Sequence, residues 1–85
     1  MDISRNEQRV LHALAQGGCI AVIKDQRGKI VDLEFFNRDG WLMTSCNLTL
    51  FRKLKAKKAI ASSDGRPYRI TRRGLELVRS ELDNR

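Results

Sequence analysis

The sequence predicts a small α+β fold, and three observations support this prediction. A capping sequence near residue 4 precedes an apolar stripe with helical spacing; residues 19–43 alternate between apolar and polar side chains; and a short basic helix precedes a turn flanked by strand-like residues. A basic helix followed by a two-stranded turn is typical of winged-helix domains. We therefore expect a single winged-helix-like domain over residues 1–85, with an antiparallel β-hairpin or meander inserted after the first helix.

The first helix is predicted over about residues 4–16. Ser4 and Glu7 have the spacing of a capping box, in which each side chain accepts a hydrogen bond from an otherwise unpaired backbone N–H. Two glycines at residues 17–18 end the helix, because glycine adopts the left-handed conformation of a C-terminal cap at little cost. Three apolar residues share one face of this helix: Val10, Leu11 and Leu14.

Residues 19–43 have the two-residue period of β-strands. The clearest strand runs from Val31 to Phe35, where Asp32 and Glu34 alternate with apolar residues. Turn-forming sequences lie on both sides of it, at residues 25–28 and 37–40. Residues 41–43 can start a third strand or lead into the next helix, so the segment is either a hairpin or a short meander.

A second, basic helix is predicted next, and Thr44, Ser45 and Asn47 are its candidate N-caps. Lys58 is expected in the last turn, where a cation interacts favourably with the helix dipole. Leu48, Phe51 and Leu54 form the apolar face, whereas Arg52, Lys53 and Lys57 point away from it and Lys55 lies at its margin.

The wing is predicted from Ile60 to Ile70. Asp64 and Gly65 form its turn, and Tyr68 and Ile70 alternate with a polar residue on the return strand. The last helix is capped by Thr71 and carries an apolar face made of Leu75, Val78 and Leu82.

Charge is concentrated in this second half of the chain. Residues 1–50 carry six basic and six acidic side chains, whereas residues 51–73 carry nine basic side chains and one acidic one, a formal charge of +8. Such a segment attracts polyanions or an acidic protein surface; the alternative is a solvated helix face that binds nothing. The candidate binding residues are Arg52, Lys53, Lys55, Lys57, Arg66, Arg69, Arg72 and Arg73.

Base-specific DNA recognition has less support than charge attraction. It requires polar side chains near the start of a recognition helix, and only Asn47 and Thr49 qualify. The aromatic residues are not interleaved with the basic run, so they do not form a stacking platform for single strands. Phe36 and Trp41 flank a predicted turn and are candidates for a protein interface, and a homodimer formed through these two residues is a third possible function. Alternatively, Trp41 covers the edge of the core.

Composition argues against several other classes of protein. The chain has two cysteines, no CxxC motif and one histidine, so we expect no metal site and no cofactor. No carboxylate pair, nucleophile motif or phosphate-binding glycine loop is present, and we expect no enzymatic activity. No apolar run reaches the roughly 20 residues that span a bilayer. The N-terminus also lacks the pattern of a secretory signal, which predicts a cytoplasmic protein.

Four segments together resemble the YjhX-type toxin family, and the similarity extends over essentially the whole chain. These segments are residues 4–18, 51–60, 65–70 and 82–85. The resemblance implies a small bacterial cytoplasmic toxin that binds and inhibits DNA topoisomerase I. It also implies an acetyltransferase-like antitoxin as a second partner. The chain departs from an ordinary winged helix, because strands replace the helix expected before the recognition helix. This departure favours protein contact over standard major-groove binding, although a winged-helix regulator that binds duplex DNA remains the alternative.

Overall fold

The computed structural model describes residues 3–83, with side chains described up to residue 79. In this part the chain forms three helices and two antiparallel sheets, so the predicted α+β class is confirmed. The elements follow in the order α1 (Arg5–Ala15), β1 (Cys19–Lys24), β2 (Ile30–Phe36), β3 (Leu42–Met43), α2 (Leu48–Ala56), β4 (Ile60–Ala61), β5 (Arg69–Ile70) and α3 (Arg72–Asp83).

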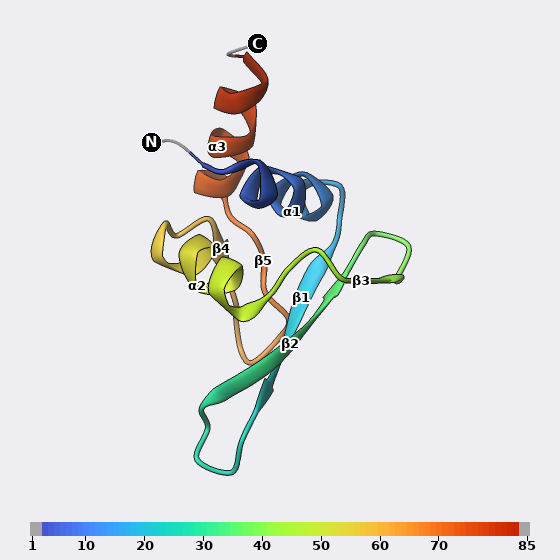
Figure 1. Cartoon of the computed structure of the whole chain (residues 1–85), viewed down its shortest axis with the longest axis vertical. Coiled ribbons are helices and arrows are strands. Elements are labelled where there is room, and N and C mark those ends of the chain that lie inside the picture. The colour runs from blue at the N-terminus through green and yellow to red at the C-terminus, as the bar shows by residue number, and fades with distance from the viewer. Residues whose placement is uncertain (1–2, 84–85) are drawn as a thin grey trace.

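The larger sheet is the meander predicted after the first helix. Its strands lie in the order β1–β2–β3, with Ile20 opposite Phe35 and Phe36 opposite Leu42. Figure 1 shows the β1–β2 hairpin and α3 extending toward opposite ends of the molecule, whose longest dimension is 44 Å. The third strand therefore exists, but it is only two residues long and lies at the edge of the sheet.

The smaller sheet pairs β4 with β5, and residues 62–68 form the connection between them. It is joined to the larger sheet through Ile20 and Tyr68. The N–H of Ile20 donates to the Tyr68 carbonyl at 2.9 Å, and the N–H of Tyr68 donates to the Ile20 carbonyl at 2.7 Å. These reciprocal hydrogen bonds fix the β4–β5 hairpin beside β1.

Helix α1 has the predicted caps. Ser4 Oγ accepts from the Glu7 N–H at 3.1 Å, and Glu7 Oε1 accepts from the Ser4 N–H at 3.0 Å, which completes the capping box. At the other end Gly17 has φ +118°, and the backbone N–H groups of Gly17 and Gly18 satisfy the last helical carbonyls.

The core lies where the three helices meet the two sheets. The predicted apolar stripe of α1 (Val10, Leu11 and Leu14) is buried in it. On α3 the prediction was partly wrong: Leu77 and Val78 are buried, Leu75 is only half-buried, and the side chain of Leu82 lies outside the described residues. The other large contributors are Ile20, Phe35, Phe51, Leu54 and Ile60.

The end of α2 differs from the prediction. The helix ends at Ala56, Lys57 is its C-cap, and Lys58 lies beyond the last turn in the left-handed conformation with φ 60°. The N–H of Lys58 donates to the Lys55 carbonyl at 3.0 Å, and the N–H of Ala59 donates to the Leu54 carbonyl at 3.0 Å. This is a Schellman cap, which turns the chain so that Ala59 enters the core.

Candidate partner-binding surface

Helix α2 separates its apolar and basic side chains as predicted. Phe51 and Leu54 are buried, whereas Arg52, Lys53 and Lys55 are exposed. Asn47 is the N-cap of this helix, and its Oδ1 accepts from the Leu50 N–H at 2.8 Å. Because this oxygen serves as the N-cap, the amide of Asn47 is less available for reading a base than the sequence indicated.

Tyr68 connects the basic face of α2 to the β4–β5 hairpin. Its ring packs edge-on against Phe51 with 5.0 Å between centroids, and Lys55 Nζ lies 5.8 Å from the Tyr68 ring centroid. Lys55 is therefore next to the hairpin that carries Arg66, which is itself exposed at the turn.

Arg72 and Arg73 lie near the end of α2. Thr71 Oγ1 donates to the Lys58 carbonyl at 2.7 Å and accepts from the Gly74 N–H at 3.1 Å, so one hydroxyl caps α3 and ties it to α2. Both arginines are exposed in the first turn of α3. Arg73 Nη1 is 3.8 Å from Glu76 Oε1, a solvent-exposed ion pair that leaves most of its charge available.

Two of the eight candidate cations contact α1 or the residues just after it. Arg69 is exposed, but its Nη1 donates to the Gly17 carbonyl at 3.4 Å, near the end of α1. Lys57 was expected to point toward a partner; its Nζ is instead 2.6 Å from Glu7 Oε2, and its side chain is only 21% exposed. The physical reason is that the C-cap position of α2 faces the first turn of α1.

The Glu7–Lys57 pair was missed because its members are 50 residues apart and no local pattern joins them. The Glu7 side chain is 4% exposed and accepts hydrogen bonds from both Ser4 and Lys57. Burial by itself raises the pKa of the Glu7 carboxyl, but the hydrogen bonds from Lys57 and Ser4 outweigh it and hold the pKa below its ordinary value of 4.5.

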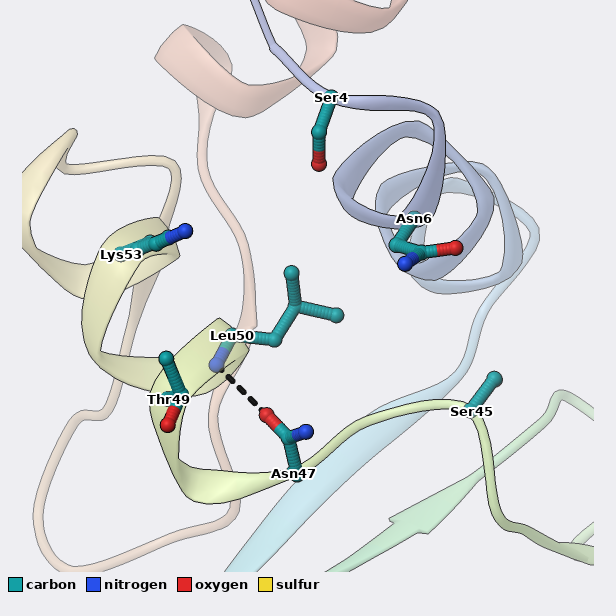
Figure 2. A pocket seen from close by; sticks show the side chains of 7 residues that line it. All are labelled: Ser4, Asn6, Ser45, Asn47, Thr49, Leu50 and Lys53. Atoms are coloured by element: carbon teal, nitrogen blue, oxygen red, sulfur yellow. Dashed lines mark hydrogen bonds between the residues drawn. The ribbon is translucent and has the colours of Figure 1, made fainter.

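A polar cleft of about 290 Å³ lies between the first turns of α1 and α2 (Figure 2). Figure 2 shows Leu50 pointing between the two helices, and Lys53 is the one cation among the lining residues. Ser4 and Asn47 already serve as N-caps. The cleft is lined by Ser4, Asn6, Ser45, Asn47, Thr49, Leu50 and Lys53.

The two candidate interface aromatics differ in exposure. Trp41 is 71% exposed, so it does not cover the edge of the core, whereas Phe36 is half-buried.

Both cysteines are free, and burial raises the pKa of the Cys46 thiol to about 11. Over residues 3–79, no group of three His, Cys, Asp or Glu side chains is placed to hold a metal ion. None of the described helices is long and apolar enough to cross a membrane.

Comparison with known proteins identifies one family. Its profile matches residues 1–85, and its description is "Putative toxin of bacterial toxin-antitoxin pair". The chain is 64% identical to the UPF0386 protein of Chelativorans sp. (strain BNC1) and 65% identical to that of Sinorhizobium fredii. It is 62% identical to the UPF0386 protein of Agrobacterium fabrum, and each of these alignments covers 100% of both chains. No solved structure matches the chain.

Proposed function

Because this chain belongs to the YjhX-type toxin family, we propose that it acts as an interaction protein that binds and inhibits DNA topoisomerase I. A toxin of this kind has an antitoxin partner, and we assign that role to an acetyltransferase-like protein by the family resemblance. The contact with topoisomerase I requires no catalytic group on this chain, so the proposed toxin is not an enzyme. Its site of action is the cytoplasm.

The observation that supports this proposal is a set of exposed cations on three neighbouring elements. Lys55 lies beside Tyr68 of the β4–β5 hairpin, and the hydroxyl of Thr71 ties the start of α3 to the end of α2. We define the basic surface as Arg52, Lys53, Lys55, Arg66, Arg72 and Arg73. Arg69 adds charge beside α1. Lys57 is left out of the basic surface because its Nζ lies 2.6 Å from Glu7 Oε2.

The proposed scaffold is winged-helix-like. In this interpretation α2 is the recognition helix and the β4–β5 hairpin is the wing, which the hydrogen bonds between Ile20 and Tyr68 attach to β1. Between α1 and α2 the chain forms strands, so the first helix of a helix-turn-helix is absent from residues 16–47. We infer that the scaffold presents its basic surface to a protein or to a protein–DNA complex.

Direct binding tests this proposal. The purified chain is mixed with DNA topoisomerase I in the presence of nuclease, and the mixture is separated by size-exclusion chromatography. Co-elution supports a protein–protein contact, because nuclease removes any DNA that could bridge the two. The proposal is wrong if the two proteins elute separately in the presence of nuclease and also fail to co-elute, without nuclease, when topoisomerase I is bound to a short DNA duplex.

The second candidate function is a DNA-binding regulator. It is favoured by the exposure of Thr49, Arg52 and Lys53 on the outer face of α2. A gel shift with duplex DNA at several salt concentrations tests it. Affinity that depends on phosphate contacts falls as salt rises, and each such contact makes the plot of log affinity against log salt steeper by about 0.9. Tight, sequence-dependent binding to DNA alone favours the regulator, and weak binding to DNA alone favours the protein partner.

A further inference from the structure

The polar cleft between α1 and α2 has hydrogen-bond donors on both of its sides. Figure 2 shows Ser4 and Asn6 on the α1 side of the space beyond Leu50, and Lys53 on the α2 side. Ser4 Oγ accepts from the Glu7 N–H in the capping box, which leaves the hydroxyl proton available for another acceptor. The side chains of Asn6 and Lys53 form no hydrogen bond with the described residues. The cleft therefore presents a hydroxyl, an amide and an ammonium group to a ligand that accepts hydrogen bonds.

The charge around the cleft is positive. Lys53 lines it, and no lining residue in the described part of the chain is acidic. Glu7, the acidic residue in the first turn of α1, is paired with Lys57, whose Nζ lies 2.6 Å from its Oε2. Arg52 is exposed next to Lys53 on α2 and adds to the positive potential. A negatively charged ligand is therefore the one that the cleft favours.

The arrangement of the donors favours phosphate over carboxylate. A carboxylate has two oxygens in one plane, whereas a phosphate group has at least three acceptor oxygens that point in different directions. Donors that approach from two helices match the phosphate geometry better. The volume of about 290 Å³ is close to the lower end of the range for small-molecule sites, so the ligand is small. Half-buried Leu50 packs against the core and gives the cleft an apolar base for carbon atoms attached to the phosphate.

We propose that this cleft is a phosphate-binding site, which takes the phosphate group of a small phosphate ester or of a nucleic acid. Lys53 donates a charge-assisted hydrogen bond, and the Ser4 hydroxyl and the Asn6 amide donate to the other phosphate oxygens. Lys53 also belongs to the basic surface, whereas the other lining residues do not. The site is therefore expected whether or not the chain binds topoisomerase I.

Titration of the full chain with sodium phosphate, followed by amide NMR spectra at constant ionic strength, tests the proposal. We expect saturable shifts confined to the backbone amides around the cleft, with a dissociation constant of about 1–10 mM. Constant ionic strength keeps the screening of all surface charges unchanged during the titration. Sodium acetate is the matched ligand control, and it should bind at least about fivefold more weakly because it has fewer acceptor oxygens.

Two variants test the side chains that hold the phosphate. Lys53→Gln should weaken phosphate binding at least about fivefold, because the cation is lost. Asn6→Asp should weaken it at least about tenfold, because it places a carboxylate beside the phosphate; an acid in the first turn of a helix also favours folding. The matched control is Arg66→Gln, which removes a cation of the basic surface outside the cleft and should change the dissociation constant by less than about twofold.

Two further ligands identify the source of the phosphate. A short single-stranded oligonucleotide that shifts the cleft amides at lower concentrations than phosphate, in the wild type but not in Asn6→Asp, indicates a nucleic acid. A nucleoside monophosphate that binds more tightly than the oligonucleotide indicates a small ester. Shifts that do not saturate, that spread over all exposed cations, or that persist unchanged in both Lys53→Gln and Asn6→Asp would overturn the proposal. Acetate that binds as tightly as phosphate would overturn the assignment to phosphate.

Discussion

At the scale of single residues, Glu7 has two roles that belong to different levels of the structure. One carboxylate oxygen completes the capping box of α1, and the other accepts from Lys57 at the C-terminal end of α2. The local role follows from the S-x-x-E sequence. The long-range role depends on the packing of two helices, which no spacing along the chain encodes. One buried side chain thus joins the first turn of α1 to the C-terminal end of α2.

We predict that Glu7→Gln lowers the free energy of unfolding by about 1–3 kcal/mol at neutral pH, because the buried charge pair is lost while the side chain keeps its shape. Urea denaturation measures this difference. Glu76→Gln is the matched control: it removes an exposed ion pair with Arg73 and should change stability by no more than about 0.5 kcal/mol.

The contribution of Glu7 also depends on pH. Its pKa in the folded chain lies below the ordinary value of 4.5, so this stabilisation is fully present above that pH. It is lost as the pH falls through the lower, folded pKa, where the carboxylate becomes protonated. The stability difference between wild type and Glu7→Gln should therefore shrink on acidification below pH 4.5; a difference that stays constant would contradict this account.

Lys58 provides the second prediction at this scale. It has φ 60°, a conformation that costs a lysine about 1 kcal/mol and costs glycine almost nothing. Lys58→Gly should raise the free energy of unfolding by about 0.5–1 kcal/mol, as measured by thermal or urea denaturation. Arg52→Gly, inside α2, should instead lower it by about 1 kcal/mol. Equal destabilisation by both changes would show that Lys58 is not in the left-handed conformation.

At the scale of elements, close packing of α3 against the β4–β5 hairpin positions Arg72 and Arg73. This contact depends on Gly74, since a Cβ at this residue would overlap the Ala59 carbonyl oxygen and would lie 2.6 Å from Ile70 Cγ1. A glycine inside a helix usually lowers stability relative to alanine, so here the close approach of another backbone requires it.

We therefore predict that Gly74→Ala is destabilising by about 1–3 kcal/mol, despite the better helix propensity of alanine. Arg72→Ala, two residues earlier in the same helix and exposed, should change stability by less than about 0.5 kcal/mol. Urea denaturation of the two variants measures both values. A stabilised Gly74→Ala would mean that α3 packs farther from β4 than described.

At the scale of the whole molecule, local sequence patterns predicted much of the structure. The capping box, the glycine stop after α1 and the alternation in β2 each depend on neighbours along the chain, and these elements form as expected. The Schellman cap at Lys58, the burial of Leu77 and the Glu7–Lys57 pair depend on packing between distant segments. The charge imbalance indicated which segment carries exposed cations, but it could not show that Lys57 forms an ion pair with Glu7 of the same chain.

The distribution of charge is the second property of the whole molecule. The basic surface on α2, the β4–β5 hairpin and α3 contrasts with residues 1–50, whose six basic and six acidic side chains sum to zero. Such a surface suits an acidic or polyanionic partner. The proposed inhibition of topoisomerase I should therefore depend on the basic surface.

Relaxation of supercoiled plasmid by DNA topoisomerase I tests this claim most directly. We compare the wild-type chain with the triple variant Arg52→Ala, Lys53→Ala and Lys55→Ala on α2. The control, Lys24→Ala, Arg27→Ala and Lys29→Ala, removes the same charge from the tip of the β1–β2 hairpin. We predict inhibition by the wild type and the control, and its loss in the α2 variant. Undiminished relaxation at a clear molar excess of wild type, or equal inhibition by both triple variants, would contradict the account.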